Sequence, residues 1–93
     1  MENVELYHKG HKITIIEIHN WFCSYVDGIE NAEQYDTSYG IGCEVTFTKD
    51  NEVGFDTNHM YNEDMTQAGK FYDALRQALC FINELKKEHN YGS

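Results

Sequence analysis

Apolar residues in the C-terminal third of the chain recur every three or four positions. They are Ala68, Phe71, Leu75, Ala78, Leu79, Ile82 and Leu85. This spacing places one apolar face along an amphipathic helix, which Asp64 or Thr66 is suited to begin and Asn90 with Gly92 to end. We expect its opposite face to carry ordinary solvated charge, at Lys70, Asp73, Arg76 and Glu84.

The N-terminal half has the β-branched and alternating patterns of strands. We expect strands at 4–8 and 13–19, the second continuing through a bulge near Asn20 into residues 21–26. Residues 29–40 are polar without a period, so a loop is expected there.

Residues 41–48 alternate as one half-buried strand, with Cys43, Val45 and Phe47 on its apolar face. A turn at Asp50 and Asn51 leads back into a partner strand at 52–55. The whole pattern predicts a single α+β domain over residues 1–93, in which four to five antiparallel strands carry one long C-terminal helix on one face.

The charge of the chain limits its partners. Sixteen acidic residues against seven basic ones give a net charge of −9, which disfavours nucleic-acid polymers and anionic membranes. Three widely spaced cysteines, Cys23, Cys43 and Cys80, do not form a disulfide framework or a zinc motif. Reduced thiols and an acidic N-terminus unlike a signal peptide indicate a cytoplasmic protein.

The segment Gly54-Phe55-Asp56-Thr57-Asn58-His59 is the first candidate site, because it lies where a strand passes into a loop. Asp56 and His59 could contact a ligand, act as an acid–base pair, or simply close the connection. A metal would need further ligands, for which Glu63, Asp64 or Cys43 are available in the sequence.

Two other segments offer contacts to a ligand. Lys9 and Lys12 belong to a turn rich in histidine and lysine that could receive a phosphate, although a solvated hairpin tip has the same composition. Trp21 and Tyr39 could stack on a base or pack on a protein, although most such rings complete a core. The sequence contains no phosphate-binding glycine loop and no zinc-protease motif, and we expect no cofactor.

The order of these features resembles that of small, largely uncharacterised phage and prophage proteins. The residues that carry the resemblance are Trp21, Cys23, Tyr25 and Val26, then Gly40, Gly42, Val45, Thr46 and Phe47, and finally Gly54, Phe55, Asp56 and His59. The resemblance covers about two thirds of the chain, and its most specific part is the motif Gly-Phe-Asp-x-x-His. It implies a phage accessory protein that counters host defence, either by sequestering a nucleotide immune signal or by blocking a host protein.

We therefore expect a non-enzymatic homo-oligomer that captures a nucleotide-like signal in the host cytoplasm. Asp56 and His59 would contact base or ribose, Trp21 and Tyr39 would stack, and Lys9 or Lys12 would meet phosphate. An acidic inhibitor of a basic host protein and a metal-dependent hydrolase at Asp56 and His59 are the alternatives.

Overall fold

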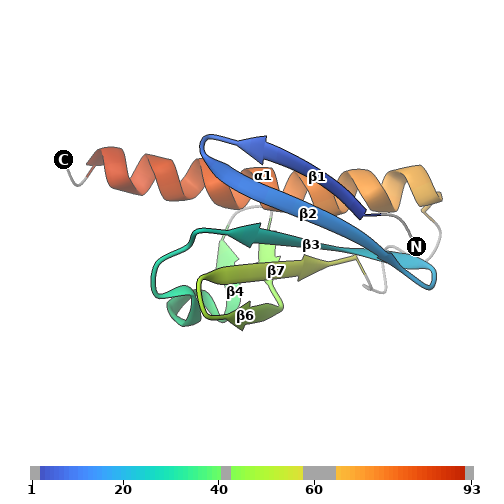
Figure 1. Cartoon of the computed structure of the whole chain (residues 1–93), viewed down its shortest axis with the longest axis horizontal. Coiled ribbons are helices and arrows are strands. Elements are labelled where there is room, and N and C mark those ends of the chain that lie inside the picture. The colour runs from blue at the N-terminus through green and yellow to red at the C-terminus, as the bar shows by residue number, and fades with distance from the viewer. Residues whose placement is uncertain (1–2, 41–42, 58–64, 92–93) are drawn as a thin grey trace.

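The computed structural model describes residues 3–40, 43–57 and 65–91, with the backbone alone at 37–40 and 88–91. It contains a five-stranded antiparallel sheet in the order β1-β2-β3-β7-β6, a two-stranded sheet of β4 and β5, and a long C-terminal helix (Figure 1). The elements are β1 Asn3–His8, β2 His11–Ile18, β3 Trp21–Asp27, η1 Ala32–Tyr35, β4 Thr37–Gly40, β5 Cys43–Val45, β6 Phe47–Lys49, β7 Glu52–Asp56 and α1 Gln67–Tyr91. The predicted α+β fold is confirmed.

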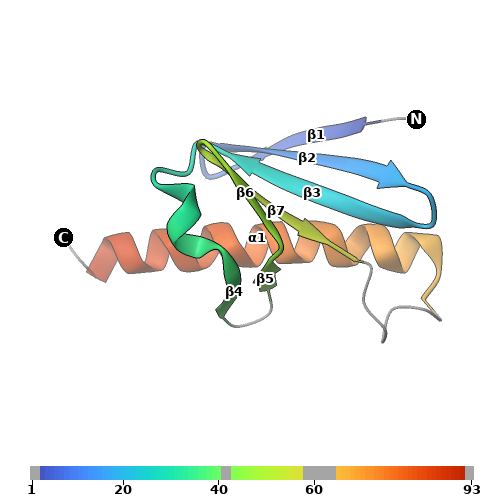
Figure 2. The ribbon, with the colours of Figure 1, turned by 90° about the horizontal axis from the view of Figure 1, so that it is seen from below.

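The helix α1 covers one face of the five-stranded sheet (Figure 2). Its start is capped as predicted, because the hydroxyl of Thr66 accepts a 3.0 Å hydrogen bond from the amide of Gly69. Its apolar face forms the core together with the strands, and the buried apolar residues of the helix are Ala74, Ala78, Phe81, Ile82 and Leu85. Burial of this face, more than helix propensity, stabilises a helix of this length.

The expected bulge near Asn20 is wrong, because the chain reverses there. β2 and β3 form a tight hairpin in which Ile18 pairs with Trp21. His19 adopts a positive φ of 55°, the backbone conformation that a two-residue hairpin turn requires. Trp21 therefore begins a new strand at one end of the sheet instead of continuing β2.

The polar segment 29–40 is structured, and the expectation of a loop is wrong for most of it. It contains the 3-10 turn η1 and the strand β4. Ile29 and Ala32 are buried, and the ring of Tyr35 packs edge-on against Phe81 with 5.1 Å between ring centroids. These few apolar side chains anchor the segment, although it shows no regular period.

The expected strand over 41–48 is broken in two. β5 pairs with β4, whereas β6 pairs with β7, and Thr46 lies between them. The amide of Thr46 donates a 2.9 Å hydrogen bond to the carbonyl of Gly54. Cys43 and Val45 are buried as predicted, but Phe47 is exposed on the face of the sheet away from α1, so its predicted orientation is wrong.

The two faces of the five-stranded sheet differ. Alternate residues such as Ile13, Ile15, Val26 and Phe55 point to α1 and are buried. In the part of the chain that the structure describes, no element lies over the opposite face, called the open face below (Figure 2). By strand register the open face carries Glu5, Tyr7, Lys12, Thr14, Ile16, Ile18, Trp21, Cys23, Tyr25, Asp27, Phe47, Lys49, Glu52, Gly54 and Asp56.

Within residues 3–40, 43–57 and 65–91, no helix has the length and apolar character needed to cross a membrane.

Candidate functional site

Trp21 and Asp56 lie near each other at one end of the open face. Cys23 pairs with Asp56 across β3 and β7, and Trp21 is two residues before Cys23 on the same face. Trp21 and Asp56 are therefore diagonal neighbours, at the end of the sheet formed by the His19–Asn20 turn. We call this region the turn end, and it unites two of the residues predicted from the sequence.

The backbone at the turn end is fixed by hydrogen bonds beyond the last residue of β7. The hydroxyl of Thr57 accepts a 3.0 Å bond from the amide of Phe22, and the amide of Thr57 donates a 3.1 Å bond to the carbonyl of Phe22. Thr57 is buried, so these bonds are shielded from water. They hold the strand exit next to β3 and so fix the position from which the Asp56 side chain extends.

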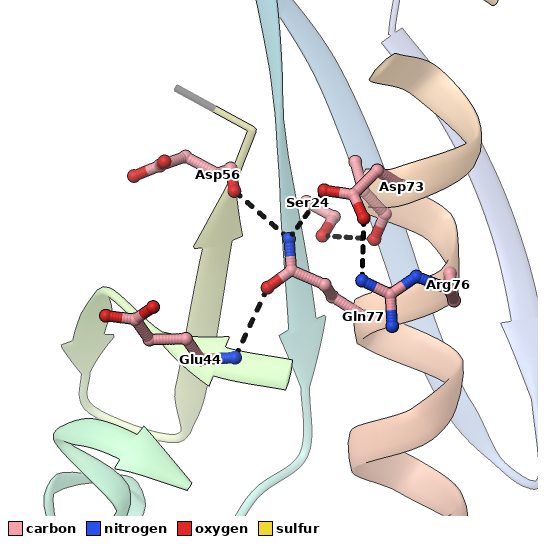
Figure 3. Close-up of polar contacts among 7 residues, drawn as sticks. Ser24, Glu44, Asp56, Asp73, Arg76 and Gln77 are labelled. Atoms are coloured by element: carbon pink, nitrogen blue, oxygen red, sulfur yellow. Dashed lines mark hydrogen bonds and ion pairs between the residues drawn. The ribbon is translucent and has the colours of Figure 1, made fainter. Parts of the chain in front are cut away.

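The end of β7 is also attached to α1 through the side chain of Gln77, which is buried (Figure 3). Its amide nitrogen donates to the main-chain carbonyl of Asp56 at 3.1 Å and to a carboxylate oxygen of Asp73 at 3.2 Å. Its carbonyl oxygen accepts a 3.3 Å bond from the amide of Glu44 in β5. One side chain thus joins the helix to strands of both sheets.

The prediction that Asp73 is solvated is wrong. Its side chain is 8% exposed, and its carboxylate lies 2.6 Å from the guanidinium of Arg76. The hydrogen bond and the charge of Asp73 raise the pKa of Arg76. The ion pair and the bond from Gln77 compensate the charge, because a buried carboxylate without partners would be strongly destabilising.

Lys70, which the sequence predicts as ordinary solvated charge on the helix, provides a cation close to the turn end. Its ammonium donates a 2.8 Å hydrogen bond to the main-chain carbonyl of Asn20, in the turn that precedes Trp21. A signal was present in the sequence, because a lysine in the first turns of a helix opposes the helix dipole and therefore suggests another partner. The ring of His19 lies 6.0 Å from that of Trp21, centroid to centroid.

Cys23 lies two residues after Trp21 on β3 and pairs with Asp56 on β7. Burial, followed by the nearby charge of Asp56, raises its pKa, although a hydrogen bond with Tyr25 partly offsets the shift. Because the thiolate is the reactive form, this environment does not activate Cys23 as a nucleophile.

The two lysines predicted to meet phosphate lie at the other end of the sheet. Lys9 is in the β1–β2 turn, and Lys12 is beside it at the start of β2. The eight residues of β2 separate this turn from Trp21 by roughly 25 Å at about 3.3 Å per residue. Lys12 also lies 3.8 Å from a carboxylate oxygen of Glu5 and 3.8 Å from one of Asp27.

The histidines of the same turn have partners as well. A ring nitrogen of His8 bonds the side-chain oxygen of Asn83 at 2.9 Å, and Nδ1 of His11 bonds the carbonyl of Asp27 at 2.9 Å. These contacts attach the β1–β2 hairpin to α1 and to the end of β3. Both histidines of this turn therefore make hydrogen bonds that hold the hairpin in the fold.

The remaining predicted residues lie apart from the open face or outside the described residues. Tyr39 belongs to β4, in the small sheet on the helix side of the molecule (Figure 2), and its side chain is not described. His59 lies outside the described residues, as do Glu63 and Asp64. Among the residues that are described, no three His, Cys, Asp or Glu side chains are grouped so that they could hold a metal ion.

At the turn end an aromatic ring and a carboxylate share the open face, and the ammonium group of Lys70 reaches the adjoining turn from α1, on the other face of the sheet (Figure 2). Such a set can stack on a planar ligand, accept hydrogen bonds from amines or hydroxyls, and attract an anion. No protein-family model, curated protein or solved structure matches this chain.

Proposed function

We propose that this protein is a non-catalytic binding protein that captures a nucleotide-like ligand at the turn end. The observation that carries the proposal is the placement of Trp21 and Asp56 as diagonal neighbours on the open face. In this arrangement the indole stacks on the base, and the carboxylate accepts hydrogen bonds from the ribose hydroxyls or a base amine.

In this proposal Lys70, and not Lys9 or Lys12, contacts the phosphate of the ligand. A 2.8 Å hydrogen bond holds its ammonium group at the carbonyl of Asn20, at the same end of the sheet as Trp21. A phosphate bound at this end would therefore lie near a cation. The net charge of −9 opposes binding of a long polyanion. A single mono- or dinucleotide needs only a local cation, which suits a small signal better than a nucleic-acid polymer.

A homo-oligomer would complete the site. The turn end lies on the open face of the sheet, and a chain of 93 residues has little material to enclose a ligand there. Ligand pockets form preferentially at interfaces. A second copy would supply a second wall for the ligand. If the chain is a phage protein, as its resemblance implies, the ligand would be an immune signal of the host cell.

Calorimetric titration with cyclic di- and trinucleotides in buffer of physiological ionic strength tests the proposal. Trp21 is the only tryptophan, so quenching of its fluorescence reports on the same event. Trp21→Ala should weaken binding by about 1–3 kcal/mol, the usual contribution of a base stacked on an aromatic ring. Asp56→Asn and Lys70→Ala should also weaken it.

Matched controls use the same residue types elsewhere on the surface. Tyr72 is an exposed aromatic residue on α1, and Asp36 is an exposed carboxylate after η1, so Tyr72→Ala and Asp36→Asn should leave the affinity unchanged. Absence of heat and quenching with every nucleotide would refute the proposal. Equal losses in Tyr72→Ala and Trp21→Ala would refute the location at the turn end.

An acidic inhibitor of a host protein is the second candidate function. It is favoured by the apolar and aromatic side chains of the open face, among them Ile16, Tyr25 and Phe47, of which Phe47 is 40% exposed. This candidate predicts that a protein ligand is lost in Ile16→Glu, is retained in Tyr72→Ala, and binds less tightly as salt is raised.

A further inference from the structure

A groove crosses the open face at the end opposite to Trp21. It has a volume of about 410 Å³. Its lining residues are Lys12, Thr14, Ile16, Tyr25, Asp27, Phe47, Lys49 and Glu52. The rings of Tyr25 and Phe47 meet edge to face, with 5.7 Å between their centroids. The groove therefore has an aromatic part beside a charged part, and the charged part holds two carboxylates and two lysines.

Gly54 allows the two rings to lie close to the sheet. A Cβ atom at this position would be 3.0 Å from the ring of Tyr25 and 3.1 Å from that of Phe47. Tyr25 pairs with Gly54 across β3 and β7, and Phe47 pairs with it across β6 and β7. The missing side chain thus creates the shape of this surface, in the manner of aromatic residues that cover a strand glycine.

Asp27 and Glu52 face each other directly in the charged part of the groove. They are partners in the register of β3 and β7, so both carboxylates point to the open face. Like charges placed opposite each other in a sheet are destabilising. Burial raises the pKa of Glu52, and a hydrogen bond with Asp27 and then the charge of Asp27 raise it further.

Two lysines that line the groove, Lys12 and Lys49, offset the negative charge of Asp27 and Glu52 only in part. Lys12 is shared between Asp27 and Glu5, at 3.8 Å from each, and Lys49 is the cross-strand partner of Glu52. The charged residues on the open face are Glu5, Asp27, Glu52, Asp56, Lys12 and Lys49, four carboxylates against two ammonium groups. The turn residue Asp50 adds a further negative charge beside Glu52. A partner that brings a positive charge would relieve this imbalance.

We propose that the groove is a docking site for an arginine side chain presented by a basic protein segment. The guanidinium lies between Asp27 and Glu52, and its plane stacks on the ring of Tyr25, while the edge of the guanidinium contacts Phe47. This interaction surface is separate from the turn end and does not depend on nucleotide capture there.

The chemistry of the groove favours arginine over the other cations. A guanidinium presents several donors in a plane and stacks on aromatic rings, whereas an ammonium is compact and strongly hydrated. A second copy of this chain is a poor occupant. Its single arginine, Arg76, is paired with Asp73, and each copy carries a net charge of −9.

The test uses the full chain, labelled with ¹⁵N, and three blocked tripeptides that differ only at the centre. Each has valine on both sides of arginine, lysine or citrulline, the last being uncharged but shaped like arginine. Amide shifts of Tyr25, Gly54 and Glu52 should saturate with the arginine peptide. The citrulline peptide should bind at least about fivefold more weakly, because it lacks the charge, and the lysine peptide should fall between them.

Variants complete the test. Glu52→Gln and Asp27→Asn should each weaken the arginine peptide severalfold. Glu17→Gln is the matched control, because Glu17 is an exposed carboxylate on the helix-side face of the same sheet, and it should bind as the wild type does. Equal binding of the arginine and citrulline peptides, unchanged binding in Glu52→Gln, or no saturable shift would each overturn the proposal.

The same proteins separate this proposal from nucleotide capture. Glu52→Gln should retain nucleotide binding, and Trp21→Ala should retain binding of the arginine peptide. Trp21 is the first residue of β3, whereas Glu52 in β7 pairs with the last residue of β3. Loss of both ligands in Glu52→Gln would show a general disruption of the sheet and would overturn the assignment of two sites.

Discussion

The side-chain amide of Gln77 donates a 3.1 Å hydrogen bond to the main-chain carbonyl of Asp56. This bond connects the middle of the long helix to the last residue of β7, where the candidate ligand contact is located. The orientation of Asp56 therefore depends on a helical residue that is distant in sequence and buried. The stability of the fold and the geometry of the turn end are consequently linked.

Replacement of Gln77 tests that link. Gln77→Leu preserves approximate size but removes the bonds to Asp56, Asp73 and Glu44. We expect the free energy of unfolding to fall by about 2–3 kcal/mol, because buried polar groups lose partners. Urea denaturation followed by circular dichroism measures the change. Gln67→Leu, at the exposed start of the same helix, should alter it by less than about 0.5 kcal/mol.

Gly54→Ala tests the close packing of rings over the sheet. The added methyl group would approach Tyr25 to 3.0 Å and Phe47 to 3.1 Å, so both rings must move. Overpacking costs about 1–3 kcal/mol, and the lower chain entropy of alanine offsets up to about 1 kcal/mol. We expect a net loss of about 1 kcal/mol in the free energy of unfolding.

A double-mutant cycle identifies the cause of that loss. In a Phe47→Ala background one of the two rings is absent, so Gly54→Ala should destabilise the protein less than in the wild type. An equal cost in both backgrounds would contradict the packing explanation. The cycle requires only denaturation curves for four proteins.

The sequence predicted the long helix and the β6–β7 hairpin well, because both depend on local patterns. Apolar residues spaced by three and four define the helix, and the Asp50–Asn51 turn joins neighbouring strands. It did not predict the break at Thr46, because the choice of β4 as the partner of β5 is a long-range contact. The burial of Asp73 likewise depends on how α1 meets the sheets.

The candidate site was only partly predictable for the same reason. The sequence predicts Trp21 and Asp56 as ligand contacts, and strand pairing places the two residues near each other. Lys9 and Lys12 were grouped with them by residue type, but the direction of β2 carries them to the other end of the sheet. Residue type indicates what a side chain can bind, whereas strand register decides which side chains share a site.

Cys43 is predicted to react slowly in the folded protein. Burial, followed by the proximity of Cys80, raises its pKa to about 11. At pH 8 only about one thiol in a thousand is then ionised, and the thiolate is the form that reacts with iodoacetamide. Peptide mass spectrometry should show at least about a hundredfold slower labelling of Cys43 in the native protein than in urea. Similar rates in both states would contradict this burial.

Glu52→Gln is predicted to stabilise the protein at neutral pH, even though it should impair arginine docking. The folded-state pKa of Glu52 is raised, first by burial and then by Asp27, so ionisation costs more in the folded than in the unfolded state. Its neighbours are of both signs, with Asp27 and Asp50 raising the pKa and Lys49 lowering it. Removal of the charge should increase the free energy of unfolding by about 0.2–1 kcal/mol, as for other like-charged cross-strand pairs.

The sign of the pH dependence follows from the same shift. The advantage of Glu52→Gln should be complete above the folded-state pKa, shrink as pH falls through it, and vanish below the ordinary glutamate value of 4.5. Urea denaturation of both proteins between neutral pH and pH 4 measures this difference. Glu17→Gln, an exposed carboxylate on the other face, should show no such trend. A variant less stable than the wild type at neutral pH would mean that Lys49 and Lys12 compensate Glu52 more than the strand register indicates.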